Sequence, residues 1–409
     1  MTLALEGIKV VEVTTMAAVP MSGRLLSDWG AEVIHVERLG TGDPWRGWIG
    51  ATLPPEFHYH FWENYSRNKR SAAIDLSQEA GREIIYKLVE EADVFLTNMR
   101  PYELQKFSLE YDTLSRLNPR LIYGSLTGYG KKGPEKDAPG QDTVAFWARS
   151  GILYMLQQGG MSPAGPGYRT LATGDKLTAL ALTCGIILAL FVRERTGLGQ
   201  EVDVSLFHTA VYALLRVALA LGPPPPGRGP GEKVRLPDRE EVSPLTISYE
   251  TKDGRWLQLS LAPPALYWSR FCQAIEREDL EHDPRFESVE ARRENQPALL
   301  QILEEVFRSK TLEEWKAPLT EGRMLWDPIQ SPAEVVADPQ ARANDFFVPF
   351  DHPTFGRIEV VANPIKLSKT PATIRTVAPE FSQHTEEVLL ELGYTWEDIA
   401  QFKEQGIIP

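Results

Sequence analysis

Apolar and polar residues follow two recurring patterns along the first half of the chain. Short runs predict a buried strand at 8–13 and further strands at 32–37, 71–76, 92–98 and 121–126. Residues 201–206 predict one more strand, in which acidic and apolar residues alternate. Longer stretches with helical spacing lie between several of them and predict helices at 20–29, 78–91 and 109–117. This alternation predicts an α/β fold with a Rossmann-like parallel sheet covered by helices on both faces.

The longest apolar run, Leu177 to Val192, predicts a helix hidden on most sides. It is too short to span a membrane. Asp175 lies where the preceding loop turns into this helix, and Gly174 leaves room for a sharp turn and a close ligand. The first N–H groups of the helix favour negative charge there. Asp175 is therefore either the central chemical residue or an ordinary helix N-cap.

The second half of the chain predicts a smaller α+β domain. Residues 222–230, Gly-Pro-Pro-Pro-Pro-Gly-Arg-Gly-Pro, form a stiff linker and a candidate domain boundary. Beyond it, Asp253-Gly254 marks the turn of a hairpin. Helices are expected at 265–276, 296–308, 312–319, 385–392 and 396–405.

Composition narrows the classes of ligand. A chain of 409 residues favours two domains, and a net charge of −13 provides no basic field for nucleic acid or an acidic membrane surface. Only two cysteines are present, and the seven histidines are scattered without a metal-binding spacing. We therefore expect no protein-bound metal and a reducing, cytoplasmic location.

Basic residues gather where the predicted strands end, which is the edge of a parallel sheet at which ligands bind. The first loop lacks the Gly-x-Gly-x-x-Gly pattern, so a dinucleotide is disfavoured. These basic residues are better explained as a local cluster that holds a phosphate-rich ligand than as a solvated rim of charged side chains. The cluster comprises Arg38, Arg46, Arg67, Lys69, Arg70, Arg100 and Lys106, and the aromatic residues Trp45, Trp48, Tyr59 and Trp62 could line a pocket beside it.

Several motifs, spread in order over nearly the whole chain, resemble the family III CoA-transferases. They are Leu25-Leu-Ser-Asp-Trp-Gly-Ala-Glu-Val-Ile-His-Val-Glu-Arg38, Gly42-Asp43, Asn68-Lys-Arg-Ser71, Asn98-Met-Arg-Pro101, Asn118-Pro-Arg-Leu-Ile-Tyr123, Gly128-Tyr-Gly130, Gly174-Asp175, Thr196-Gly-Leu-Gly-Gln-Glu-Val-Asp-Val-Ser-Leu206, Thr251-Lys-Asp-Gly-Arg-Trp256, Asp283-Pro-Arg-Phe286 and Asp338-Pro-Gln340.

The resemblance implies a large domain built from both ends of the chain, with a smaller domain inserted between them and two subunits interlocked as a homodimer. The corresponding ranges are 1–221 for the first part of the large domain, 222–241 for the linker, 242–335 for the small domain and 336–409 for the return segment.

It also implies transfer of coenzyme A from an acyl-CoA to a carboxylic acid, through anhydride and aspartyl-CoA thioester intermediates on Asp175. Coenzyme A is then a substrate, and no tightly bound cofactor is expected. The positions that match CoA-binding residues are Ala18, Arg38, Lys69, Asn98 and Lys106, and those assigned to the acyl pocket are Trp48, Tyr59 and Gln141. Ala17 replaces a family glutamine, and residues 243–249 lack the glycine-rich flap of some members.

Two alternatives remain. The same fold hosts α-methylacyl-CoA racemases, whose catalytic histidine aligns with Gln141, and an amide cannot serve as a proton base. A non-catalytic CoA-binding protein would keep the basic cluster without needing Asp175. Among transferases, segments 127–134 and 139–151 most resemble enzymes for 2-hydroxy acids or aryl acids, and Phe146 and Trp147 fit either a bulky acyl pocket or helix core.

Overall fold

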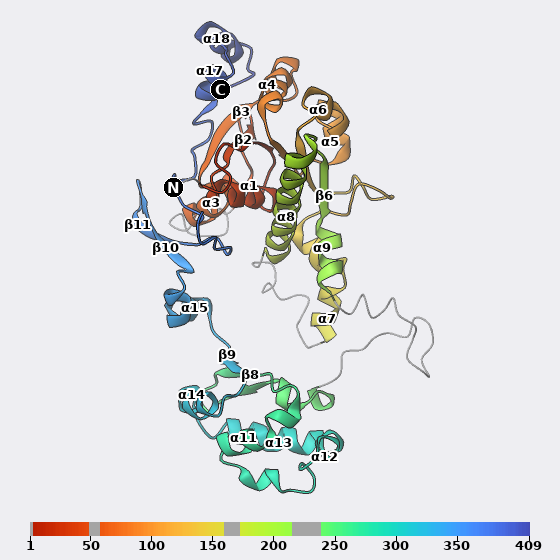
Figure 1. Ribbon diagram of the computed structural model, residues 1–409, viewed down its shortest axis with the longest axis vertical. Helices are drawn as coiled ribbons and strands as arrows, with labels where there is room; N and C mark the ends of the chain where they lie inside the picture. The colour runs from red at the N-terminus through yellow and green to blue at the C-terminus, as the bar shows by residue number, and fades with distance from the viewer. Residues whose placement is uncertain (1–2, 49–57, 159–171, 215–238) are drawn as a thin grey trace. The chain divides into compact units, whose positions relative to one another are not determined.

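The computed structural model describes residues 3–48, 58–158, 172–214 and 239–409. The chain divides into two compact units (Figure 1). The first combines Met1–Pro230 with Asp345–Pro409, and the second is Gly231–Asn344. The first unit is therefore built from both ends of the chain, as expected. The proposed linker at 222–241 lies almost entirely outside the described residues.

A parallel sheet of six strands forms the centre of the first unit. Its order, β3-β2-β1-β4-β5-β6, is the doubly wound order of dinucleotide-binding folds. The α/β prediction and all six predicted strands are confirmed. The strands are β1 (Lys9–Val13), β2 (Glu32–Arg38), β3 (Lys69–Ile74), β4 (Val94–Thr97), β5 (Ile122–Thr127) and β6 (Glu201–Ser205).

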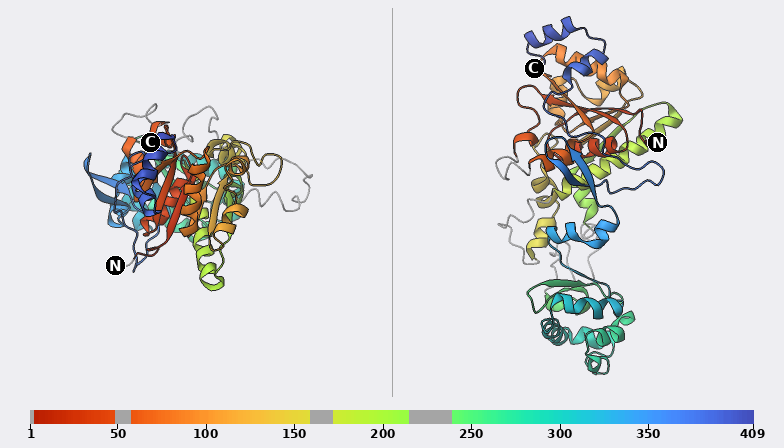
Figure 2. Two further views of the ribbon diagram at one scale, coloured as in Figure 1. Left: turned by 90° about the horizontal axis from the view of Figure 1, so that it is seen from above. Right: turned by 90° about the vertical axis from the view of Figure 1, so that its left-hand side faces the viewer.

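Helices cover one face of this sheet (Figure 2). A continuous apolar core fills the space between these helices and the strands. Val11 and Val13 of β1 contribute to this core, whereas Val10, one residue before Val11, belongs to the core on the opposite face, as the alternation of a strand requires. The helices on this side are α4 (Glu79–Glu91), α5 (Pro101–Phe107), α6 (Tyr111–Leu117), α17 (Thr385–Glu391) and α18 (Trp396–Glu404).

The other face packs against the helices that carry the candidate site. They are α1 (Ala18–Asp28), the π-helical turn η3 (Asp142–Ala148), α8 (Thr173–Thr196) and α9 (Leu206–Ala213). Leu26 of α1 and Leu182 of α8 are fully buried in the same core. A hydrogen bond of 2.8 Å joins the hydroxyls of Ser22 and Thr183, so α1 and α8 also share a polar contact inside the fold.

The helix α8 differs from its prediction in length and exposure. It runs for 24 residues with a mean hydropathy of 1.9 in its most apolar window, which is long and apolar enough to cross a membrane by length and composition alone. The expectation that it is too short was wrong because it continues past both ends of the apolar run. It packs on β5 and β6 as a core helix does, but Leu188 and Phe191 are 59% and 55% exposed.

Several helices of the first unit were not predicted, because their sequences lack clear helical periodicity. The stretch that carries the aromatic residues of the predicted pocket contains α2 (Trp45–Trp48) and α3 (His58–Ser66), and α7 (Ile152–Gln158) follows η3. The chain returns through the antiparallel hairpin of β10 (Phe347–His352) and β11 (Gly356–Val361) before α17. The amide of Asp75 donates to the carbonyl of Ile407, which ties the end of the described chain to β3.

The second unit is a small α+β domain, as predicted. Its antiparallel sheet contains β7 (Ser248–Glu250), β8 (Trp256–Leu259) and β9 (Trp326–Pro328). The unit extends to Asn344, beyond the expected 335, because α16 directly follows α15. Its helical elements are η5 (Arg239–Glu241), η6 (Pro244–Thr246), η7 (Pro264–Leu266), α11 (Trp268–Ala274), η8 (Glu278–Glu281), α12 (Val289–Glu294), α13 (Gln296–Phe307), α14 (Leu312–Glu321), α15 (Pro332–Ala337) and α16 (Pro339–Ala343).

Candidate active site

Asp175 is the third residue of α8 and does not cap it. Ala172 occupies the N-cap position with φ of +39°, and the helix start has no side-chain cap. The N-cap alternative for Asp175 is therefore excluded. The first turn of α8 presents this carboxyl from a helix that is anchored along its length in the core, which gives it a fixed position.

The surroundings of Asp175 disfavour its charged form. Its side chain is half-buried. Burial and, next, the negative charge of Asp142 raise its pKa to about 7, against the opposing effect of the Lys176 ammonium. A carboxyl whose pKa is shifted by burial and by a neighbouring acid is typical of a functional site.

Asp142 reaches Asp175 from η3, on a different segment of the chain. Only 7% of Asp142 is exposed, and its Oδ2 accepts a 3.2 Å hydrogen bond from the indole N–H of Trp147. Burial raises its pKa, while the Trp147 bond and the backbone N–H groups of Asp175 and Gly174 lower it. The negative charge that acts on Asp175 therefore comes from η3. π-Helical turns often occur at functional sites.

The glycine at 174 allows this close approach. A Cβ at that position would lie 2.1 Å from Asp142 Oδ1 and 2.3 Å from Phe146 Cγ. Glycine at position 174 therefore allows η3 to pack directly against the backbone of α8. Phe146 and Trp147 are 2% and 8% exposed, so they are core residues, and the acyl-pocket interpretation of these two is not supported.

A small apolar cluster connects the first turns of α8 with the start of α1 and with α3. It consists of Ala17, Met21, Trp45, Tyr65 and Ala179. Ala179 is one helical turn beyond Asp175. The pKa of the Tyr65 phenol is raised by burial and then by the charge of Asp175. Asp175 therefore lies near the β1–α1 loop at the carboxyl edge of the sheet, where ligands of such folds bind.

The β1–α1 loop is held by side chains from the neighbouring strands. Asp43, after β2, accepts 3.1 Å hydrogen bonds from the amide of Met16 with both oxygens. Asn98, after β4, accepts from the amide of Thr15 at 3.0 Å and donates to its carbonyl at 2.7 Å. Met16 has φ of +72°, a conformation that such a residue keeps only when its surroundings enforce it.

A buried chain of charges lies below this loop. The ammonium of Lys69 donates to both oxygens of Glu12 at 2.9 Å and to the carbonyl of Pro20 at 2.8 Å. The ring of His35 is 2.6 Å from Glu12 through Nδ1 and 3.5 Å from Asp43 through Nε2. Hydrogen bonds to Asp43 and Glu12 outweigh burial and raise the pKa of His35 to about 9.

The residues predicted to bind CoA fall into two groups. Ala18, Lys69 and Asn98 surround or support the β1–α1 loop, whereas Arg38 and Lys106 are exposed and form no ion pair with the described residues. Lys69 has no exposed side-chain surface, and its bonds to Glu12 and Pro20 occupy its ammonium. It therefore supports α1 from below and does not present its charge to a ligand.

Most of the predicted basic cluster is neutralised within the protein. Its members pair as Arg46 with Glu37, Arg67 with Asp28, Lys69 with Glu12, Arg70 with Glu391 and Arg100 with Glu103. Sequence reasoning identified these cations and missed the carboxylates that neutralise them. A sequence signal existed, because Glu12, Asp28 and Glu37 lie in or next to the predicted strands and the first helix.

The remaining predicted residues are less informative. Gln141 precedes η3 and is exposed. Trp48 ends α2 and Tyr59 belongs to α3, but their side chains lie outside the described part of the structure. Residues 243–249 form η6 and β7 in the second unit.

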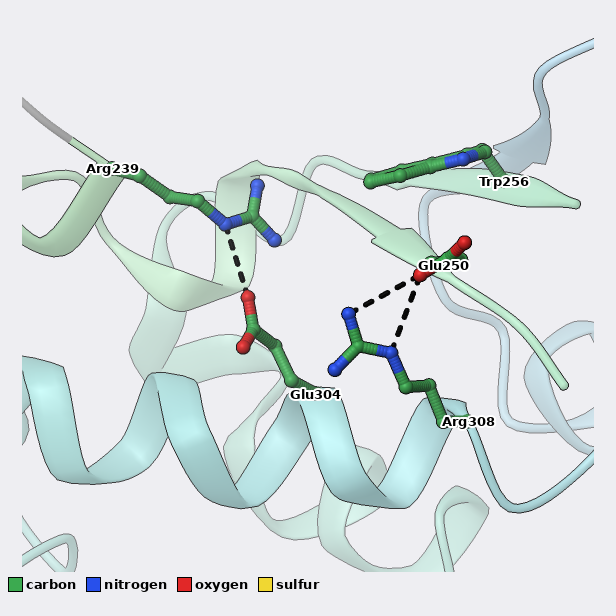
Figure 3. Close-up of a pocket in the computed structure, with 5 residues that line it drawn as sticks. All are labelled: Arg239, Glu250, Trp256, Glu304 and Arg308. Carbon is green, nitrogen blue, oxygen red and sulfur yellow. Dashed lines mark hydrogen bonds and ion pairs between the residues drawn. The ribbon is translucent and has the colours of Figure 1, made fainter. Parts of the chain in front are cut away.

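The second unit contains a surface hollow of its own (Figure 3). Arg239 pairs with Glu304 and Arg308 with Glu250, beneath the partly exposed ring of Trp256. Because each arginine is matched by a carboxylate, the hollow provides no net charge for an anionic ligand. The chemistry of the chain is therefore better located at Asp175.

Comparison with known proteins gives a consistent result. The sequence profile described as CoA-transferase family III matches residues 5–385. The chain is 36% identical to (R)-2-hydroxy-4-methylpentanoate CoA-transferase of Clostridioides difficile, over 99% of this chain and 100% of the relative. It is 32% identical to cinnamoyl-CoA:phenyllactate CoA-transferase of Clostridium sporogenes, over 98% and 96%. The crystal structure of a CAIB/BAIF family protein from Brucella suis matches with a TM-score of 0.80 and 30% identity, covering 96% of this chain and all of that one.

The buried charges below the β1–α1 loop lead to a prediction about stability. Replacing Lys69 with Met leaves Glu12 buried without its main partner, which should cost about 3–5 kcal/mol in the free energy of unfolding. As a matched control, Lys9→Met removes a lysine from the exposed pair with Glu91, which should change stability by less than about 1 kcal/mol. Urea denaturation of the two variants measures the difference. Equal stability losses would contradict the supporting role of Lys69.

Proposed function

The chain belongs to CoA-transferase family III, and we propose that it works through covalent intermediates on Asp175. Its relatives are enzymes of the CoA-transferase type, which move coenzyme A between an acyl-CoA and a carboxylic acid. The observation that carries the proposal is the position of Asp175, half-buried on the first turn of α8 with a pKa raised to about 7. Surroundings that destabilise the charged carboxylate make it a more reactive nucleophile, because its negative charge is lost when the new bond forms.

The proposed reaction begins with attack by a carboxylate oxygen of Asp175 on the thioester carbonyl of the acyl-CoA. The new C–O bond gives a mixed anhydride, and CoA leaves as the thiolate with the electron pair of the broken C–S bond. The thiolate then attacks the carbonyl carbon of Asp175, which expels the first acid as its carboxylate and leaves an aspartyl-CoA thioester. The acceptor acid reverses these steps, so the thioester bond is conserved and no ATP is needed.

The position of Asp142 limits which groups can stabilise the oxyanions that form during these attacks. Backbone N–H groups at a helix start are good donors to such oxyanions. In this chain, however, the N–H groups of Gly174 and Asp175 already interact with Asp142. The β1–α1 loop, which adjoins the same apolar cluster, is the better candidate for holding the thioester end of the substrate.

We further propose a 2-hydroxy acid as the acceptor. Both relatives described above are named for such acids, 2-hydroxy-4-methylpentanoate and phenyllactate. The racemase alternative has no support in the site, because the residue in the place of the racemase histidine is Gln141.

A homodimer is also part of the proposal. The helix α8 leaves apolar side chains exposed on one stretch, Ile187, Leu188, Phe191 and Val192, and Cys184 is exposed there too. Such an apolar surface is costly on a monomer. Sedimentation equilibrium should give twice the chain mass of 45.9 kDa. A single-chain mass at all concentrations would rule the dimer out.

Replacing Asp175 with Asn tests the nucleophile. The amide is nearly isosteric, so the variant should fold and still bind CoA, but it should lose at least about 1,000-fold in transfer rate because the attacking group is gone. In the wild-type protein, hydroxylamine added with an acyl-CoA should leave a hydroxamate on the peptide that contains residue 175. Unchanged turnover in Asp175→Asn would exclude the covalent route.

A further inference from the structure

Asp142 has no part in the reaction described above, yet it is more deeply enclosed than the nucleophile. Only 7% of Asp142 is exposed. Its Oδ1 accepts no hydrogen bond of ordinary geometry from the described residues. Oδ1 faces the backbone at Gly174, where even a methyl group would collide with it. The N–H groups of Gly174 and Asp175 act on this carboxylate without forming a well-aligned hydrogen bond to Oδ1. A buried carboxylate oxygen in that situation is costly to keep and calls for a functional explanation.

The groups around Asp175 are few, and they come from each element packed near it. The negative charge of Asp142, on η3, raises the pKa of Asp175, and the positive charge of Lys176, on α8, lowers it. Tyr65 of α3 is close enough to feel both carboxylates. The positive charge of Arg24, on α1, lowers the pKa of both Lys176 and Tyr65. Asp142 is thus the one carboxylate among the described neighbours that opposes ionisation of Asp175.

This opposition has a thermodynamic consequence for the covalent half-reaction. In that step, acyl-CoA and the Asp175 carboxylate are exchanged for aspartyl-CoA and the free carboxylate of the substrate acid. The C–S bond to the acyl group breaks and a C–S bond to Asp175 forms. One oxygen passes from Asp175 to the acyl carbon, so a C–O bond of Asp175 breaks and a C–O bond of the acid forms, and no proton is gained or lost. Asp175 is negatively charged on one side of this equilibrium only. A nearby negative charge therefore raises the free energy of the unloaded enzyme and shifts the equilibrium toward aspartyl-CoA.

We propose that Asp142 is a positioning residue whose buried charge, held against the first turn of α8, favours the aspartyl-CoA form of the enzyme over the free carboxylate. This inference rests on the proposed covalent function and explains why η3 packs on a glycine. It also assigns Lys176 the opposite effect, because its positive charge stabilises the free carboxylate.

Two variants with opposite expected signs test the proposal. Asp142→Asn keeps the shape and the acceptor for Trp147 but removes the charge. At a fixed ratio of acyl-CoA to free acid, intact-protein mass spectrometry should show the ratio of loaded to unloaded enzyme reduced by several-fold to about tenfold, since a shift of one pKa unit corresponds to a factor of ten. Lys176→Gln should raise the same ratio. The matched control is Glu135→Gln, which removes a carboxylate that is half-exposed and paired with Arg149 on the segment before η3.

The outcomes separate this inference from the proposed function. If wild-type enzyme forms no aspartyl-CoA at all, the covalent function fails. If wild-type enzyme loads and Asp142→Asn loads equally well, only the role of Asp142 is overturned. Should Asp142→Asn fold poorly, Lys176→Gln decides alone, and an unchanged or lower loaded fraction contradicts the proposal.

The pH profile of kcat/KM gives a second readout. The apparent pKa, expected near 7 in the wild-type enzyme, should fall in Asp142→Asn. A merely structural role would lower the activity equally at every pH.

Discussion

The packing of η3 against the backbone at Gly174 is the constraint on which the rest of the site depends. It brings the carboxylate of Asp142 and the ring of Phe146 so close to α8 that no side chain fits at position 174. It is supported from the sheet, because Gly128 after β5 and Gly140 before η3 also approach each other too closely for side chains. The sheet thereby fixes η3, and η3 fixes the start of α8. This contact brings the charge of Asp142 near the half-buried carboxyl of Asp175, which we propose as the nucleophile.

The opposite side of the site is built by a different physical means. Glu12, Lys69 and His35 are almost completely buried, and removing such charges from water is expensive unless each is paired. His35 contacts Asp43, and Asp43 accepts a hydrogen bond from the amide of Met16. These contacts hold Met16 in its unfavourable backbone conformation with positive φ. A balanced set of buried charges thus trades stability for a defined shape of the β1–α1 loop, while α8 is held by close apolar packing.

Apolar periodicity was sufficient to predict the sheet, because β1 to β5 are short and mostly buried strands and β6 alternates acidic and apolar residues. It failed for α3, whose aromatic residues carry no helical pattern, and for η3, whose turn is set by contacts with α8. The sequence singled out Asp175 through the glycine before it and the apolar run after it. It could not show that Lys69 is enclosed by Glu12, because a lysine beside a strand end has the same local sequence whether its partner is a phosphate or a distant carboxylate.

The most direct test of a carboxylate nucleophile follows oxygen atoms through turnover. If the acceptor acid carries ¹⁸O in its carboxylate, attack on the aspartyl-CoA thioester places one labelled oxygen in the anhydride bridge, and formation of the new acyl-CoA leaves that oxygen on Asp175. Peptide mass spectrometry after many turnovers should therefore find ¹⁸O in the peptide containing Asp175, and none when the label is supplied as water. Complete turnover with no label on Asp175 would contradict the covalent account.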